Sequence, residues 1–223
     1  MILPLYFRNG HVFVEIGRNL WLLDTGSPAS FGGEGLILAG REFHPPTDYL
    51  GLTVEELSHH VSVECAGLLG CDILNCFDVV MDLPGERIEF SSEELPTGGQ
   101  TIPIEDVVEG IPIVPAAINQ FEQRMFFDSG AGISYWQDIA SLETFPPAGE
   151  TVDFYPGIGE FRLKTYRVDV TLGPLTATCR CSALPASLQG LLQMAENVSG
   201  IIGNEIMRDR KIGYFPRRGV VAV

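Results

Sequence analysis

The stretch Leu22-Leu23-Asp24-Thr25-Gly26-Ser27 governs the interpretation of this chain, because a second stretch, Phe126-Phe127-Asp128-Ser129-Gly130-Ala131, repeats its pattern. Each begins with two apolar residues and continues with Asp, a hydroxyl residue, Gly and a small residue. Each is followed downstream by two aliphatic residues and a Gly, at Leu68-Leu69-Gly70 and at Ile201-Ile202-Gly203. A single Asp-Thr-Gly is commonly a turn. Two copies with the same downstream partner indicate an internal duplication.

The duplication extends to both sides of the two motifs. Leu3-Pro4-Leu5 precedes the first Asp much as Ile102-Pro103-Ile104 precedes the second. Each copy also closes with an expected hairpin, which ends at Ile88-Glu89-Phe90 in the first copy and at Gly219-Val220-Val221 in the second. The repeat therefore spans nearly the whole chain.

The boundary between the two copies is predicted at the segment Ser91–Gln100. This segment is polar and acidic, and Pro96 and the pair Gly98-Gly99 within it are typical of a flexible linker. We therefore expect an N-terminal lobe over residues 1–95 with the first Asp, and a C-terminal lobe over residues 96–223 with the second.

The residue pattern predicts a mostly-β protein with few short helices. Apolar and polar residues alternate over many stretches, and Gly and Pro interrupt them. Thr53 followed by Glu56 has the form of a helix capping box, and short helical turns are expected after Gly70 and Gly203. The clearest helical pattern covers residues 185–197, where leucines recur on one face.

The paired motifs and the duplication resemble the aspartic peptidases of the pepsin and retroviral type. The resemblance implies a bilobal acid-protease fold, in which two pseudo-twofold-related β lobes each bring one Asp to a shared cleft. Asp24 and Asp128 are then the catalytic pair, with no metal and no cofactor. In this class, two carboxyl groups about 3 Å apart share one proton. One carboxylate activates a water molecule, and its protonated partner polarises the carbonyl of the peptide bond.

Four residues beside the aspartates have expected supporting roles. Gly26 and Gly130 keep side chains out of the centre and let the backbone turn sharply. By resemblance, the hydroxyls of Thr25 and Ser129 hydrogen-bond across the interface between the halves. Such bonds lock the two loops in place, as a closely positioned pair of carboxyl groups requires.

The two motifs differ at their last position. Ser27 is expected to donate a hydrogen bond to a carboxylate and to favour its charged form, whereas the side chain of Ala131 has no donor. The shared proton also predicts an activity optimum at mildly acidic pH.

A longer segment separates the Asp from its downstream Gly in the second half than in the first. It includes Val152–Phe161, two extended arms around a Pro-Gly-Ile-Gly tip, which is similar to the glycine-rich flap hairpin of retroviral proteases. Gly157 and Gly159 permit the turn and the opening motion of a lid, and Tyr155 and Ile158 are candidates for substrate contact. Pepsin-like enzymes carry the flap in the N-terminal half. Here we expect the first half to be too short for one, so that a single flap comes from the second.

Composition limits the partners and the location of the protein. The formal net charge of −15 argues against nucleic acid, because phosphate binding requires clustered Lys and Arg. No signal peptide or membrane-spanning run is recognisable, and the five Cys, an odd number, are expected to be free thiols. The pair His59-His60 with Cys65 and Cys71 fits no common zinc pattern, so no metal is expected. We therefore expect a cytoplasmic protein without membrane attachment.

The preferred interpretation is an aspartic endopeptidase that acts on a peptide or protein in extended conformation. A monomer suffices, because one chain supplies both aspartates. Two alternatives stay open. The first is a homologue that binds a peptide strand by backbone pairing and cleaves it weakly or not at all. The second is a peptidase dedicated to one partner protein.

Overall fold

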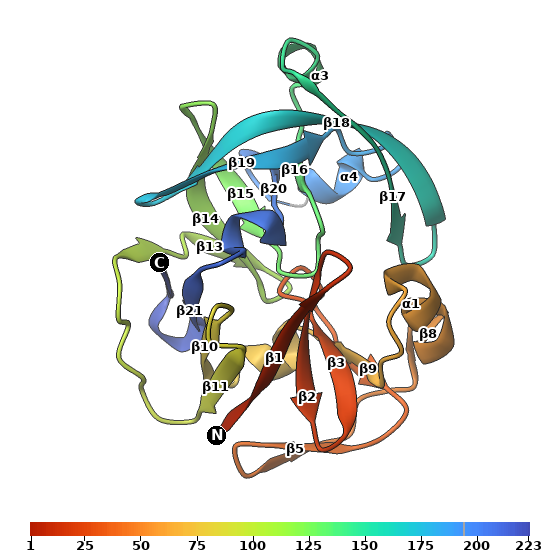
Figure 1. Ribbon diagram of the computed structural model, residues 1–223, viewed down its shortest axis with the longest axis vertical. Coiled ribbons are helices and arrows are strands. Elements are labelled where there is room, and N and C mark those ends of the chain that lie inside the picture. Colours follow the sequence, from red (N-terminus) through yellow and green to blue (C-terminus); the bar gives the residue numbers. More distant parts are fainter. Residues whose placement is uncertain (194) are drawn as a thin grey trace.

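The protein is described by a computed structural model over residues 1–193 and 195–223. Its strands form two large sheets, one in each of two lobes (Figure 1). Strands β1, β2 and β3 of the first lobe lie at the bottom of this view, and β17, β18 and β19 of the second lobe lie at the top. The predicted mostly-β architecture with two lobes is confirmed.

Within the described residues, the first sheet has ten strands. Three of them, β12, β21 and β22, come from the second half of the chain. In spatial order the strands are β12 (Thr101–Pro103), β22 (Val220–Ala222), β21 (Lys211–Phe215), β10 (Asp78–Asp82), β11 (Arg87–Ser91), β1 (Ile2–Arg8), β2 (His11–Ile16), β3 (Asn19–Leu23), β9 (Gly67–Leu69) and β4 (Phe31–Gly32).

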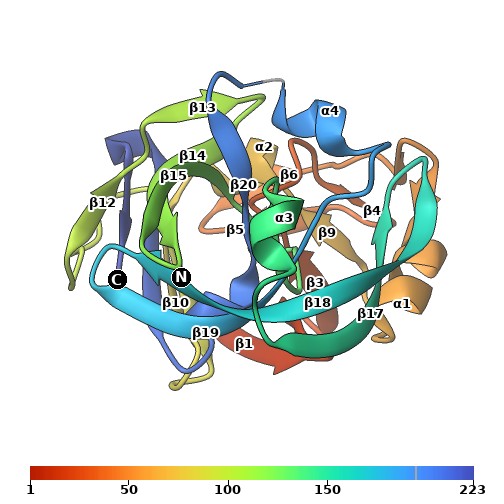
Figure 2. The same ribbon diagram turned by 90° about the horizontal axis from the view of Figure 1, so that it is seen from above.

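The second sheet comes entirely from the second half and has eight strands in the described part of the chain. Figure 2 shows its long, curved strands β18 and β19. In spatial order the strands are β13 (Asp106–Val108), β14 (Ile111–Ile118), β15 (Phe121–Phe127), β20 (Val198–Ile202), β16 (Ser134–Trp136), β19 (Leu175–Ser182), β18 (Gly159–Leu172) and β17 (Pro147–Tyr155). The first half adds two small hairpins, made by β5 (Leu36–Leu38) with β6 (Arg41–Phe43) and by β7 (Asp48–Tyr49) with β8 (Leu52–Thr53).

Helices are short and lie mainly where they were expected. They are α1 (Val54–Val61), α2 (Cys71–Leu74), α3 (Ile139–Leu142), α4 (Gln189–Leu192), and the 3₁₀ turns η1 (Asn204–Met207) and η2 (Pro216–Arg218). The capping box that begins α1 is confirmed, because Thr53 and Glu56 each bond the other's backbone N–H. The turns after Gly70 and Gly203 are confirmed as α2 and η1.

The helix expected over residues 185–197 is wrong in length. Only α4 is helical there, and Met194 lies outside the described residues. Leu188 and Leu192 are instead buried in a cluster of the second lobe. Tertiary packing therefore uses the apolar residues of this segment without a long helix.

The two Asp motifs follow strands that pair in the same way. β3 runs parallel to β9, with Leu22 opposite Leu68, and β15 runs parallel to β20, with Phe126 opposite Ile201. The apolar pair before each Asp therefore lies beside the aliphatic pair downstream. Both halves build their Asp loop by the same arrangement, as the duplication predicted.

One large hydrophobic core contains residues of both halves, and two smaller clusters accompany it. The first-lobe cluster consists of Phe13, Leu22, Phe31, Leu52, Leu57, Val61, Cys65 and Leu68. The second-lobe cluster includes Ile113, Phe126, Ile133, Tyr135, Leu184, Leu188, Leu192, Ala195 and Val198.

A buried carboxylate on the first sheet binds the segment Pro216–Arg218 near the end of the sequence. Asp78 on β10 is 0% exposed and accepts hydrogen bonds from Arg217 at 2.9 Å and Arg218 at 2.6 Å. The same arginines donate to backbone carbonyls of the segment between the halves, including that of Leu95. The predicted linker is therefore held by hydrogen bonds from arginine side chains to its backbone carbonyls. The division into lobes at residues 95 and 96 stays a prediction.

We predict that Asp78→Asn lowers the free energy of unfolding by about 3 kcal/mol, because it leaves two arginines without the buried charge that they neutralise. Urea unfolding measures the loss. The matched control is Arg87→Gln, which removes an exposed pair with Asp82 and should cost less than about 1 kcal/mol. Equal losses in the two variants would contradict this account.

Candidate active site

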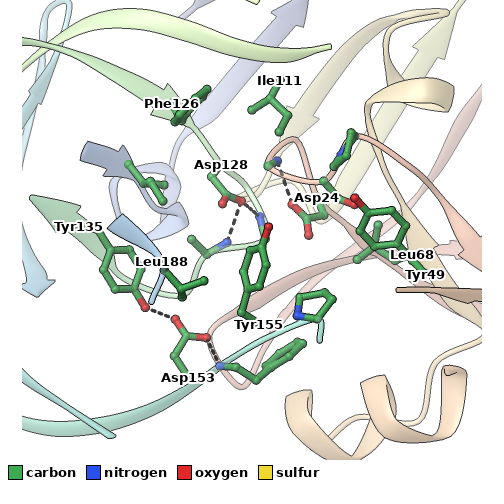
Figure 3. Close-up of a pocket in the computed structure, with 18 of the residues that line it drawn as sticks. Asp24, Tyr49, Leu68, Ile111, Phe126, Asp128, Tyr135, Asp153, Tyr155 and Leu188 are labelled. Atoms are coloured by element: carbon green, nitrogen blue, oxygen red, sulfur yellow. Dashed lines mark hydrogen bonds between the residues drawn. The ribbon is translucent and has the colours of Figure 1, made fainter. Parts of the chain in front are cut away.

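Asp24 and Asp128 lie face to face where the loops after β3 and β15 meet (Figure 3). Each loop passes directly against the opposite carboxyl group. A Cβ atom added at Gly26 would overlap the carboxyl group of Asp128, and one added at Gly130 would overlap that of Asp24. Because only glycine leaves this space, the two glycines allow the two carboxyl groups to approach each other.

A reciprocal set of hydrogen bonds ties the two loops together. The backbone N–H of Thr25 donates to the hydroxyl of Ser129 (3.0 Å), and the N–H of Ser129 donates to the hydroxyl of Thr25 (2.9 Å). The hydroxyls donate in turn to the carbonyls of Phe127 (2.7 Å) and Leu23 (2.9 Å). Both hydroxyl residues are buried, so these bonds are shielded from water and fix the separation of the loops.

The two carboxyl groups receive different backbone contacts. Oδ1 of Asp24 accepts a hydrogen bond from the N–H of Gly26 at 2.8 Å. Oδ1 of Asp128 accepts two, from Gly130 at 2.8 Å and from Ala131 at 3.0 Å. Donors to a carboxylate favour its charged form. The N–H of Ser27 adds the smallest contribution at Asp24, whereas at Asp128 the hydrogen bond between the two carboxyl groups acts in the same direction as its two backbone donors, so Asp128 is the better stabilised anion of the pair.

The expected hydrogen bond from Ser27 to a carboxylate is wrong. The hydroxyl of Ser27 donates to the carbonyl of Ala29 at 2.8 Å. A serine side chain readily bonds a backbone group two residues away, and this local bond satisfies the buried hydroxyl. The extra donor lies in the other half, where the backbone N–H of Ala131 contacts Asp128.

Burial is the largest cause that raises the pKa of both aspartates. The pKa of Asp24 rises well above its ordinary value, and the charge of Asp128 and a hydrogen bond between the two carboxyl groups add to the effect. The backbone donors of Ala131 and Gly130 offset part of the rise in the pKa of Asp128. The pair therefore keeps one proton to a higher pH than an isolated carboxyl group does.

Two side chains behind the loops support them at matched positions of the repeat. The thiol of Cys71 donates to the carbonyl of Thr25 (3.2 Å), and Nδ2 of Asn204 donates to that of Ser129 (3.1 Å). Asn204 also donates to the carbonyl of Gly10 (2.8 Å). Cys71 and Asn204 each follow the downstream Gly of their copy, so the repeat aligns these two supports, but their residue types differ and did not predict the role.

The two smaller hydrophobic clusters form opposite walls of a cleft of about 200 Å³ with both aspartates in its lining. The first-lobe wall consists of Leu22, Phe31, Leu52 and Leu68. The second-lobe wall contains Phe126, Tyr135, Leu184, Leu188 and Leu192. Each Asp therefore has an apolar surface beside it.

The hairpin of β17 and β18 covers this cleft, and its predicted form is confirmed. Gly157 and Gly159 have positive φ angles of 77° and 87° at its turn, and Ile158 between them is 46% exposed. Tyr155 lines the cleft, and its ring extends towards the aspartates in Figure 3. The hairpin thus places Tyr155 in the cleft and leaves Ile158 outside it, while its role as a flap stays a prediction.

The hairpin rests on helix α1 of the first lobe, as Figures 1 and 2 both show. The ring of Phe154 stacks on that of His60, with centroids 4.5 Å apart. Nδ1 of His60 lies 3.0 Å from the Glu160 carboxylate. Phe154 also packs against the first-lobe cluster. These contacts hold the hairpin closed across the cleft.

The first half also contributes to the lining of the cleft, and the expectation that it has no flap of its own stays a prediction. Its small hairpin β7–β8 places Tyr49 in the lining, near Asp24 (Figure 3). His11 lines the cleft as well and donates from Nδ1 to the carbonyl of Gly130 at 3.1 Å. Burial lowers the pKa of His11 and favours its neutral ring. No sequence pattern distinguished Tyr49 or His11 from other aromatic residues.

Two kinds of feature are absent from residues 1–193 and 195–223. No helix there has the length and apolar character needed to cross a membrane. No group of three or more His, Cys, Asp and Glu side chains in these ranges is placed to hold a metal ion.

Comparison with known proteins supports the fold. No family model and no curated protein matches the sequence. Among solved structures, the chain is similar to the crystal structure of the aspartic proteinase from Irpex lacteus, at a TM-score of 0.50 and 10% sequence identity. The alignment covers 100% of this chain and 97% of that one. The protein therefore has the bilobal β fold of the aspartic proteinases, and its activity must be argued from its own residues.

We predict that the aspartate pair makes stability depend on pH. The folded pair keeps its proton above the pH at which unfolded carboxyl groups lose theirs, so this contribution is present at low pH and is lost as the pH rises through the raised pKa. Asp24→Asn removes the repulsion and should stabilise the protein by about 1 kcal/mol at pH 7.5. The advantage should shrink towards pH 4. Guanidinium unfolding at both pH values tests this, with exposed Glu122→Gln as control, and an equal advantage at both would contradict it.

We also predict that His60→Ala loosens the hairpin, because it removes the stack with Phe154 and the contact with Glu160. Loss of about 1 kcal/mol should speed amide hydrogen exchange of residues 152–161 roughly fivefold. The control is His59→Ala, on the same helix at an exposed position. Unchanged exchange in His60→Ala would show that other contacts close the hairpin.

Proposed function

We propose that this protein is an aspartic endopeptidase in which Asp24 and Asp128 activate a water molecule for attack on a peptide bond. One observation carries the proposal: two carboxyl groups with raised pKa values lie face to face in an apolar cleft. Holding two such groups together costs stability, and sites that oppose stability in this way are typical of function. The fold of the aspartic proteinases agrees with the proposal.

The contacts of the two carboxyl groups support an assignment of the general base and the general acid. Asp128, which accepts two backbone hydrogen bonds, is the carboxylate that takes a proton from the water. Asp24 carries the shared proton and donates it towards the carbonyl oxygen of the substrate. The oxygen of the water bonds to the carbonyl carbon, the C–N bond then breaks, and a proton passes to the leaving nitrogen.

The cleft fits an extended polypeptide whose side chains beside the cleaved bond present apolar groups to the two walls. Each aspartate has one apolar wall next to it. β17 is an edge strand of the second sheet, and such an edge can pair with the backbone of an extended peptide. The β17–β18 hairpin lies across the cleft, and we propose that it opens to admit the substrate. A single chain supplies both aspartates, so a monomer is proposed.

The contacts that close the hairpin over the cleft also favour two alternative functions. A partner protein that displaces Phe154 from the first-lobe cluster would make this a peptidase dedicated to that partner. Without such displacement the cleft would hold a peptide weakly, as in a homologue that binds without cleaving.

The test is cleavage of a diverse peptide library between pH 3 and 8, followed by mass spectrometry. We predict a bell-shaped profile, because activity requires one proton on the pair. Asp24→Asn and Asp128→Asn should each reduce cleavage at least about 1,000-fold, whereas Asp106→Asn, at an exposed position, should keep it. Cleavage that survives both active-site substitutions would refute the mechanism, and absence of cleavage by folded wild type would favour the binding homologue.

A further inference from the structure

The two walls of the cleft differ in charge. The first-lobe wall of Leu22, Phe31, Leu52 and Leu68 is apolar, and the first half adds the uncharged side chains of Ser27 and Tyr49 to the lining beside it. The second-lobe wall is apolar up to its end at the β17 hairpin, where the carboxylate of Asp153 lies. The two sides of the cleaved bond therefore meet different chemical surroundings.

Asp153 is held in place by neutral donors. One carboxylate oxygen accepts a hydrogen bond from the hydroxyl of Tyr135, which is 3% exposed, and the other accepts from the N–H of Phe154 at 2.8 Å (Figure 3). These donors orient the carboxylate without neutralising its charge. In the described part of the chain, no Lys, Arg or His side chain pairs with Asp153 within 4.0 Å.

The cleft also lacks a positive charge of its own. Among its lining residues in the described chain there is no Lys or Arg, and His11 is favoured in the neutral form because burial lowers its pKa. Glu109 adds a second carboxylate to the lining. The charge of Asp153 reaches the reaction centre, since it contributes to raising the pKa of Asp128.

We infer that the second-lobe side of the cleft binds a lysine or arginine side chain of the substrate and that Asp153 determines this specificity. The inference rests on the proposed peptidase function and names its substrate class. A long basic side chain has an aliphatic stem and a charged end. The stem lies along Leu184 and Leu188, and the charged end reaches Asp153. The opposite wall, with Leu22 and Leu68, takes an apolar side chain. Cleavage thus falls between one apolar and one basic residue.

The experiment uses two series of peptides with leucine on one side of the central bond. The other side carries lysine, arginine, norleucine or glutamate, and the two series place leucine before or after that bond. A charge-assisted hydrogen bond to the oriented carboxylate of Asp153 should give wild type about a tenfold to hundredfold preference for lysine or arginine over norleucine in kcat/KM, in one of the two series. Equal cleavage of the lysine and norleucine peptides in both series would overturn the inference and leave the peptidase proposal intact.

Variants of Asp153 test the residue itself. Asp153→Asn should reduce the ratio of lysine to norleucine cleavage to about one, whatever its absolute rate, and Asp153→Glu should restore a preference. Glu122→Gln, an exposed charge change, is the control that keeps the wild-type ratio. If Asp153→Asn keeps the preference for lysine, another residue determines that preference and the role of Asp153 is overturned.

Binding of peptides that resist hydrolysis tests the subsite separately from the peptidase proposal. Reduced-amide peptides of the same two series, which resist hydrolysis, are titrated by calorimetry into wild type and Asp153→Asn. Tighter binding of the lysine peptide by wild type alone would support the subsite even if no peptide is cleaved. Equal affinities for lysine and norleucine would reject it.

Discussion

The rest of the structure depends on the reciprocal bonds between the loops of Thr25 and Ser129. Two backbone N–H groups and two buried hydroxyls hold the loops at a separation that repulsion and dehydration of the carboxyl groups oppose. Because these bonds are buried and mutually oriented, breaking one leaves a buried polar group unsatisfied. Behind the two loops, Cys71 and Asn204 add hydrogen bonds to the carbonyls of Thr25 and Ser129.

The two Asp loops and their strands form a symmetric floor of the cleft. The segments that lie over the cleft differ between the halves and form an asymmetric cover. Below the cleft, each half places its Asp after a strand that runs parallel to its downstream partner. Above it, the second half supplies the long β17–β18 hairpin, and the first supplies helix α1, where that hairpin rests. In the proposed reaction, a symmetric floor suits a chemical step in which two carboxyl groups exchange roles. An asymmetric cover gives the two sides of a bound chain different neighbours, and Asp153 on the hairpin is one consequence.

Stability and the proposed function oppose each other at the aspartate pair. The raised pKa values of Asp24 and Asp128 mean that the folded state becomes less favourable as the pair loses its proton. Contacts elsewhere offset this. The ion pairs of Asp78 with Arg217 and Arg218 hold the segment near the end of the sequence against the first sheet. Strands β12, β21 and β22 bring the second half into that sheet. The lobes therefore share backbone hydrogen bonds as well as an interface.

The sequence by itself determined the duplication, the mostly-β class, the two Asp loops, the hairpin of residues 152–161 and the capping box at Thr53. These features depend on neighbouring residues or on a pattern that occurs twice, so they can be recognised without distances. Only the tertiary structure decided that the hydroxyl of Ser27 turns to Ala29, that Tyr49 and Asp153 enter the cleft, and that the hairpin closes on His60. Each of these depends on side-chain direction or on contact between segments far apart in the chain. Packing sets such directions and contacts, and residue type does not record them.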